Sequence, residues 1–297
     1  MTAAPPPSGF PGRKAALKAI GWSIAFIVLT ILLASLLGYG GALLVQRSSA
    51  GAVSWLSGGA GAATLLQALV TLLSAGIFTW LIGVRICRLT RDDLRYAPAR
   101  SGLRGFGRGA LVGAAAALAA LLISVAGGAA WVRDSGGPGE YLIQALKTVL
   151  VLAPAALSEE AIFRGVPLVL FALVLGRGAA LLLVAVLFAL AHLTNPNVTP
   201  LGIGNIALAG VFLGVAFYAP GGIWTACGAH FGWNALLACL DAPVSGIPFR
   251  IPLLDYHAGH RAWLTGGSFG PEGGLAATMA LTAAILVAWR WTGKEPP

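Results

Sequence analysis

Charged residues are scarce in this chain of 297 residues. Only 10% of the residues are Asp, Glu, Lys or Arg, whereas 58% are hydrophobic. Typical soluble domains contain about 25% charged residues, so a soluble protein of this size could not cover its surface with so few. The composition therefore excludes a cytosolic enzyme, a nucleic-acid-binding module and a disordered chain.

Cysteine is also rare, and the three cysteines form no recognisable pattern. Cys87, Cys227 and Cys239 contain no CxxC spacing, so the sequence predicts neither a disulfide framework nor a cysteine-based zinc site. The 41 glycines follow no Gly-X-Y period, which excludes collagen. Together with the many alanines, they suit closely packed transmembrane helices.

Long apolar runs dominate the remaining sequence. A bilayer core requires roughly 20 apolar residues per helix, and the fourth run is too long for one straight span. It contains Pro154, Gly165 and Pro167, so we expect it to be tilted or broken. The predicted spans are approximately 20–45, 62–86, 109–132, 142–175, 179–193, 201–218, 223–240 and 274–291. The expected fold class is therefore all-α, a polytopic integral membrane protein with about eight transmembrane helices.

Basic residues are unevenly distributed between the two sides of these spans. The net charge is +9, and seven arginines lie between Arg85 and Arg108. With the N-terminus inside, thirteen Lys and Arg residues fall on the cytoplasmic side and four fall outside, as the positive-inside rule requires. The pattern predicts a multi-pass protein of the cell (inner) membrane with both termini cytoplasmic. We expect the protein to contact the lipid bilayer and to have no nucleic acid as a partner.

Few ionisable residues lie within the spans, and such residues are functional candidates because a charge inside a bilayer is costly. Three motifs on three spans contain them: Glu159-Glu160-x-x-x-Arg164, Phe188-x-x-x-His192 and His230-x-x-x-Asn234. Glu160 and Arg164 are four residues apart, so they can form an ion pair on one helix face. An antiparallel hairpin of the fourth and fifth spans would place Glu160 and His192 at similar depth.

These residue types can supply what amide hydrolysis requires. A buried carboxylate beside a histidine can deprotonate water, and we predict that Glu159 and His192 form this pair. His230 and Asn234 can donate hydrogen bonds to the developing oxyanion, as preorganised donors do in other enzymes. Two histidines and a glutamate are also a known set of catalytic zinc ligands. Zinc is therefore an open alternative, with Glu159, His192 and His230 as its candidate ligands.

Two other classes of protein are also open from the residues alone. Polar residues on helices can hold spans together, as in a non-proteolytic immunity or scaffold protein. Carboxylates and histidines also line the paths of transporters. A transporter would favour broken helices at corresponding positions of two halves, and only the fourth predicted span is irregular.

The three motifs, in this order on successive membrane helices, resemble the CAAX-protease and bacteriocin-processing family (CPBP), also called the Abi family. The resemblance covers about residues 145–240 and departs from the family's pattern at none of the core positions. It implies an intramembrane endopeptidase, a hydrolase of the glutamic or metalloprotease type. Its substrate would be a membrane-associated protein or peptide, which in eukaryotes is a prenylated CAAX protein. Six residues would be catalytic: Glu159, Glu160, Arg164, His192, His230 and Asn234.

This interpretation divides the chain into four segments. Residues 1–19 form a cytoplasmic tail, and residues 20–141 form three spans with the basic loop. Residues 142–240 form the catalytic membrane core, and residues 241–297 form an outer loop, the last span and a second cytoplasmic tail.

Overall fold

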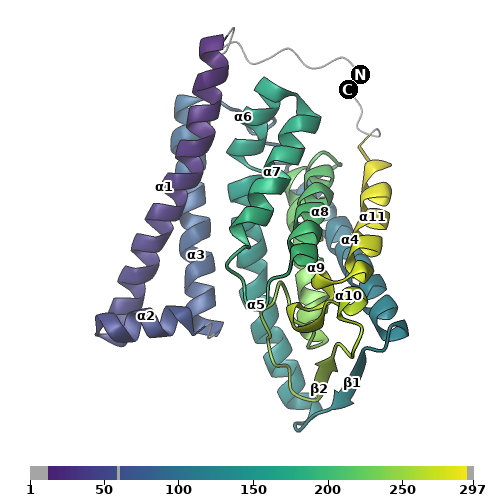
Figure 1. Ribbon diagram of the computed structural model, residues 1–297. Coiled ribbons are helices and arrows are strands. Elements are labelled where there is room, and N and C mark those ends of the chain that lie inside the picture. Colours follow the sequence, from purple (N-terminus) through teal and green to yellow (C-terminus); the bar gives the residue numbers. More distant parts are fainter. Residues whose placement is uncertain (1–12, 59–60, 293–297) are drawn as a thin grey trace. The chain divides into compact units, whose positions relative to one another are not determined.

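The computed structural model describes residues 13–58 and 61–292, which form two compact units (Figure 1). The first unit takes in the described residues up to Tyr96 together with Pro154–Val184, and the second takes in Ala97–Ala153 and those from Ala185 onward. Residues 1–12 of the predicted N-terminal tail and 293–297 of the predicted C-terminal tail lie outside the described residues. The predicted core segment 142–240 contributes to both units.

Each of the eight predicted spans contains a helix, so the all-α polytopic fold is confirmed. Within residues 13–58 and 61–292, five helical segments are long and apolar enough to cross a membrane: Lys14–Gln46, Gly61–Ile86, Ala99–Ala126, Pro138–Leu175 and Pro200–Phe217. Two further apolar helices, Arg177–Ala191 and Leu275–Trp289, are shorter. The number of spans stays a prediction, because these shorter helices do not have the length that identifies a membrane span.

The first unit is built around a long N-terminal helix. Its elements are α1 (Arg13–Gln46), α2 (Ser49–Ser57), α3 (Gly61–Phe78), the π-helix η1 (Thr79–Ile86), the later part of α5 (Pro138–Phe163), α6 (Val166–Leu175) and the start of α7 (Arg177–Ala191). The helix α1 packs on α2, α3 and α6. The short helix α2 was not predicted, and it lies across the ends of α1 and α3 (Figure 1). It begins where the Ser48 side chain accepts a hydrogen bond from Gly51 N at 3.1 Å, a typical N-cap.

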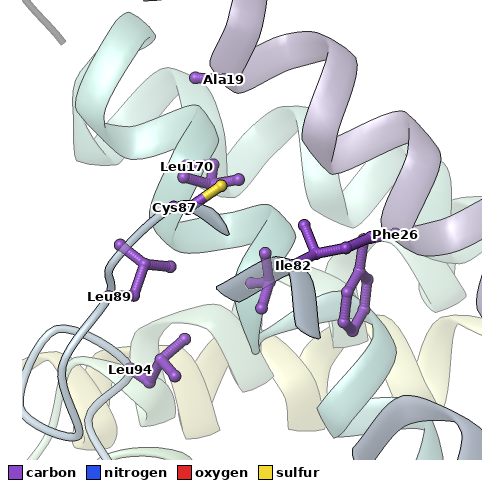
Figure 2. Close-up of a cluster of buried hydrophobic side chains, with 8 residues drawn as sticks. Ala19, Phe26, Ile82, Cys87, Leu89, Leu94 and Leu170 are labelled. Atoms are coloured by element: carbon purple, nitrogen blue, oxygen red, sulfur yellow. The ribbon is translucent and has the colours of Figure 1, made fainter. Parts of the chain in front are cut away.

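The core of the first unit reaches into the basic loop. Figure 2 shows a buried cluster that joins α1, η1, α6 and this loop. Its members are Ala19, Phe26, Ile82, Cys87, Leu89, Leu94, Val166 and Leu170. Leu89 and Leu94 alternate with the arginines, so the loop buries its apolar side chains while Arg88 and Arg91 stay at its surface. Burial also raises the pKa of the Cys87 thiol to about 11, which disfavours the reactive thiolate.

The predicted irregularity of the fourth span is confirmed as a break between α5 and α6. The helix α5 continues through Pro154 and ends at Phe163, and α6 begins at Val166 with Pro167 in its first turn. A β-carbon at Gly165 would lie 2.4 Å from Ala161 O, so only glycine fits at the break. A proline in the first turn needs no backbone N–H partner, which explains why the chain restarts its helix there.

The second unit is a bundle of helices with a small sheet at one end. Its elements are α4 (Ala99–Ala126), β1 (Ala130–Arg133), the first part of α5, the end of α7, α8 (Pro200–Phe217), α9 (Ile223–Cys239), β2 (Leu254–His257), α10 (Ala262–Thr265), the 3₁₀ turns η2 (Gly267–Phe269) and η3 (Pro271–Gly273), and α11 (Leu275–Trp289). The helix α4 packs on α9 and α11, and α8 packs on α9 and α11.

Glycines allow the backbones of α4 and α9 to touch. A β-carbon would lie 2.1 Å from Thr225 O at Gly109 and 2.0 Å from Ala229 O at Gly113. From the other side, a β-carbon at Gly228 would lie 2.0 Å from Phe106 O. Such contacts leave no room for any side chain, and they are the close approach expected where small residues recur on membrane helices.

The third predicted span is shifted relative to the helix that contains it. We predicted 109–132, whereas α4 begins ten residues earlier and ends at Ala126. Gly127 and Gly128 follow, with φ of +105° at Gly128, so the helix stops there. Residues 130–133 instead form β1, which pairs antiparallel with β2, Trp131 opposite Tyr256. The Trp131 indole donates to Leu240 O at 2.6 Å, which ties this sheet to the end of α9.

Candidate active site

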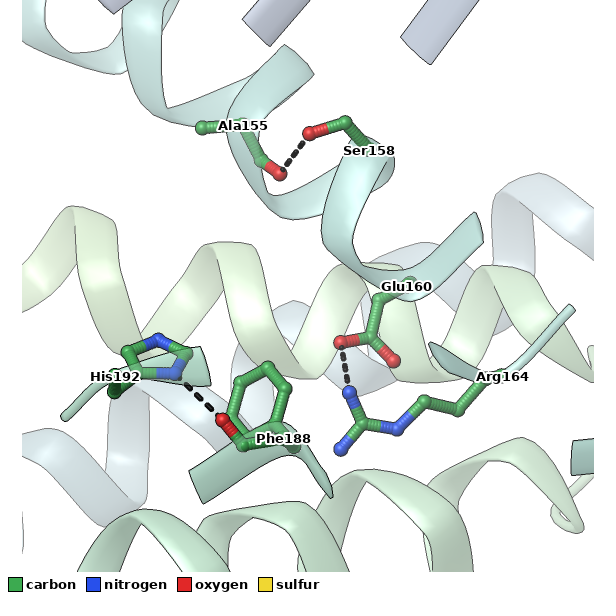
Figure 3. Close-up of polar contacts among 6 residues, drawn as sticks. All are labelled: Ala155, Ser158, Glu160, Arg164, Phe188 and His192. Atoms are coloured by element: carbon green, nitrogen blue, oxygen red, sulfur yellow. Dashed lines mark hydrogen bonds and ion pairs between the residues drawn. The ribbon is translucent and has the colours of Figure 1, made fainter. Parts of the chain in front are cut away.

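The first motif forms a buried ion pair in the first unit. Arg164 Nη1 donates to Glu160 Oε1 at 2.9 Å, and both side chains are 0% exposed (Figure 3). The predicted pair is therefore present. The pair lies at the break between α5 and α6. Arg164 directly follows the end of α5, and its backbone N–H still donates to Glu160 O at 2.7 Å. Each charge offsets the unfavourable burial of the other.

Glu159 precedes this pair and is half-buried, unlike Glu160. Consecutive residues on a helix point about 100° apart, so the two carboxylates face different surroundings. The preceding Ser158 is buried, and its hydroxyl donates to Ala155 O at 2.8 Å within the same helix (Figure 3). As a residue Glu159 is thus more exposed than Glu160, although its Oε2 atom is buried.

The two histidines of the other motifs come together in the second unit around Phe188. The Phe188 ring lies 4.6 Å from the His192 ring and 5.9 Å from the His230 ring, edge-on to the latter. Phe188 is buried and His230 is 7% exposed, whereas His192, one residue past the end of α7, is half-buried. The first residue of the Phe-x-x-x-His motif therefore packs against both histidines.

One ring nitrogen of His192 is engaged by its own helix. Its Nδ1 lies 2.8 Å from Phe188 O (Figure 3). A carbonyl oxygen only accepts hydrogen bonds, so we assign the ring hydrogen to Nδ1. Nε2 is then the basic nitrogen, and the contact fixes the orientation of the ring. This is the tautomer in which Nε2 can accept a proton or bind a metal.

His230 and Asn234 are one turn apart on α9 and therefore share a face. His230 is buried and Asn234 is half-buried. Their helix is held against α4 by the glycine contacts and by Phe231, whose ring stacks on Phe106 at 5.7 Å. The third motif thus lies on a helix whose backbone has little freedom to move.

The six predicted residues are distributed over both units. Glu159, Glu160 and Arg164 belong to the first, and His192, His230 and Asn234 belong to the second. Within the units the structure confirms the Glu160–Arg164 ion pair and packs both histidines against Phe188. The approach of Glu159 to His192 within reach of one bridging water stays a prediction.

A buried carboxylate of the second unit was not predicted. Glu272 on η3 is 6% exposed, and its oxygens accept hydrogen bonds from the indole of Trp233 at 3.0 Å and from both the backbone N–H and the hydroxyl of Ser245. Burial raises its pKa, whereas these donors and the nearby charge of His192 oppose the rise. The sequence signal was weak: a single glutamate between Pro271 and Gly273, before the last apolar run.

A metal site cannot be built from either unit alone. Within each unit, the described residues contain no group of three His, Cys, Asp or Glu side chains that could hold a metal ion. Nε2 of the exposed His257 on β2 lies 2.9 Å from Asp255 Oδ2. Zinc bound by Glu159, His192 and His230 would need ligands from both units, and it stays a prediction.

Comparison with known proteins identifies one family. Residues 141–236 match the model described as type II CAAX prenyl endopeptidase, Rce1-like. The match covers about a third of the chain and coincides with the predicted core at 142–240. It contains all three motifs, but it ends before Glu272. Neither a curated protein nor a solved structure matches the chain.

Proposed function

We propose that this protein cleaves a membrane-associated protein or peptide within the bilayer, since its membrane core, residues 141–236, belongs to the Rce1-like family of type II CAAX prenyl endopeptidases. The family supports peptidase activity of the CAAX type, and the apolar helices support a multi-pass membrane protein. The details of the reaction are our own inference. The observation that carries them is the complete set of three polar motifs on otherwise apolar helices.

The proposed reaction begins with activation of water. Glu159 and His192 face one water molecule, and the carboxylate removes a proton as the water oxygen attacks the peptide carbonyl carbon. The half-buried position of Glu159 supports this assignment, because the residue is partly desolvated but, unlike Glu160, not fully buried. Glu160 is engaged by Arg164 and is therefore less suited to act as the base.

The second half of the reaction requires hydrogen-bond donors. The attack places negative charge on the carbonyl oxygen, and His230 and Asn234 donate hydrogen bonds to it. Donors of this kind contribute about 3–4 kcal/mol each when they are preorganised. The rigid packing of α9 against α4 supports this role. The protonated Glu159 then delivers its proton to the leaving amine, and the carbon–nitrogen bond breaks.

The decisive experiment is cleavage of membrane-tethered peptides by the purified protein in detergent or nanodiscs. We expect the wild type to cleave peptides that include CAAX-type C-termini, and Glu159→Gln to abolish turnover with an unchanged melting temperature. Glutamine keeps the size of the side chain but cannot take up the proton. Wild-type biological activity in Glu159→Gln would favour an immunity, scaffold or transport function instead.

The same assay tests the zinc alternative. Metal analysis of the purified protein and cleavage with and without a chelator distinguish the two modes of activation. Loss of turnover on chelation, with recovery on added zinc, would assign Glu159, His192 and His230 as ligands. Unchanged turnover would support activation of water by Glu159 and His192 alone.

A further inference from the structure

The buried carboxylate of Glu272 lies outside every motif, yet it contacts the helix that carries His230 and Asn234 and a loop that is hydrogen-bonded to the segment of His192. It stands on η3, after the end of the family match at residue 236. All of its partners belong to the second unit. A buried carboxylate that accepts several hydrogen bonds is a strong structural anchor, since removal of the acceptor leaves buried donors unsatisfied.

One oxygen of Glu272 holds the helix that carries His230 and Asn234. Trp233 Nε1 donates to Glu272 Oε1 at 3.0 Å. Trp233 is buried and directly precedes Asn234, three residues after His230. Because the indole is rigid and has only two rotatable side-chain bonds, fixing its N–H fixes this turn of α9. The rotation of α9 in turn determines where the His230 and Asn234 side chains point.

The other oxygen of Glu272 leads to His192 through two loops. Its Oε2 accepts from Ser245 N and from Ser245 Oγ, the latter at 3.1 Å. Ser245 O in turn accepts from the Asn195 side chain at 2.9 Å, and Asn195 N donates to His192 O at 3.1 Å. A continuous path of hydrogen bonds therefore joins the carboxylate to the backbone of His192.

Glu272 is itself held in place by α8 and α11. The Asn205 side chain on α8 donates to Glu272 O at 2.8 Å and to Gly274 O at 2.9 Å. Thr278 on α11 donates to Asn205 Oδ1 at 2.6 Å. Asn205 is buried, so these bonds are shielded from water. The turn that presents the carboxylate is thus fixed from two helices and does not depend on His192 or α9.

We propose that Glu272 is a positioning residue for the active site, setting His230 and Asn234 through Trp233 and His192 through Ser245 and Asn195. The inference rests on the proposed function, because these three residues are its catalytic candidates. It extends the functional part of the chain beyond residue 236 to the turn before the last helix. Glutamine at this position would have one carbonyl oxygen for donors on both sides, so one of the two connections would be lost.

Histidine NMR tests this role without a substrate. The chain has four histidines, so full-length protein labelled with [¹³C]His in nanodiscs gives four ring signals, assigned with single His→Gln variants. We expect Trp233→Phe to shift the His230 signal and Asn195→Ala, which removes the side-chain donor to Ser245 O, to shift the His192 signal. Glu272→Gln should shift both, while His257 and His260 keep their positions. As a matched control, Asp255→Asn changes an exposed carboxylate and should move only His257.

Kinetics on a peptide that the wild type cleaves provide the second readout. We expect Glu272→Gln to lower kcat by about 10- to 100-fold with little change in KM, since a misplacement of about 1 Å can cost on the order of 10²-fold. Unmoved His192 and His230 signals in folded Trp233→Phe and Asn195→Ala overturn the positioning role, even if Glu272→Gln does not fold. A wild type that cleaves no peptide overturns the proposed function instead, and the NMR shifts then report only the hydrogen-bond path.

Discussion

At the scale of single residues, the two adjacent glutamates of the first motif differ in their surroundings. Glu160 is fully buried and bonded to Arg164, whereas Glu159 is half-buried. The same side chain is therefore a structural partner at one position and a candidate base at the next. Adjacent helix residues necessarily face different directions, so one helix can present both functions without a second segment.

This difference predicts that two matched substitutions affect the melting temperature unequally. Glu160→Gln removes the carboxylate charge that faces the buried Arg164 cation, and breaking a buried pair costs about 3–5 kcal/mol. We expect its melting temperature in detergent to fall clearly, whereas Glu159→Gln should melt like the wild type. Both variants should lose peptide cleavage.

A double variant separates charge from packing in the same pair. Glu160→Leu combined with Arg164→Met replaces both partners by apolar side chains, which is often neutral or stabilising for a buried pair. It should recover stability relative to Glu160→Gln but not activity. If Glu159→Gln is the destabilised variant and Glu160→Gln the stable, inactive one, the assignment of the base is reversed.

At the scale of elements, the contact between α4 and α9 decides where the third motif lies. Ala229, next to His230, contributes the carbonyl that approaches Gly113. No side chain separates the two backbones there, so any added atom must push α9 away. The position of His230 thus depends on glycines of a helix that carries no motif.

The glycine contact predicts a contrast between two substitutions in one helix. Gly113→Ala places a methyl group 2.0 Å from Ala229 O, and overpacking of this kind costs typically about 1–3 kcal/mol. We expect a lower melting temperature and slower cleavage. Gly107 of the same helix is exposed, with nothing within 4 Å of an added β-carbon. Gly107→Ala should therefore be neutral or slightly stabilising, and an equal loss in both variants would contradict the contact.

At the scale of the whole molecule, the charge distribution predicts how the chain crosses the membrane. The seven arginines between Arg85 and Arg108 are expected on the cytoplasmic side. The helix α4 connects this loop to the segment with Ser135, and its 28 residues span ~42 Å at 1.5 Å per residue, more than the hydrocarbon core. Its two ends should therefore lie on opposite sides.

Cysteine labelling of intact cells tests this orientation. In a background without Cys87, Cys227 and Cys239, an impermeant thiol reagent should not label Ser101→Cys but should label Ser135→Cys. Both positions are exposed in the folded chain, so burial does not explain a difference between them. Labelling of Ser101→Cys alone would reverse the predicted topology.

The sequence by itself determined those features that depend on residues close together in the chain. The apolar runs predicted the helices, because hydrophobic length is a local property. The spacing of Glu160 and Arg164 predicted their ion pair, because i,i+4 residues always meet on a helix. The three motifs predicted the family that the comparison with known proteins identifies at residues 141–236.

Only the tertiary structure decided the features that depend on distant segments. It packed Phe188 against two histidines, joined β1 to β2, and brought Glu272 to Trp233, 39 residues away in the chain. In the sequence Glu272 resembles an ordinary loop residue, because its hydrogen-bond donors, Trp233 and Ser245, lie on distant segments. The pattern of apolar residues along α4 likewise cannot show that Gly113 must lack a side chain, because a β-carbon there would collide with Ala229 O of another helix.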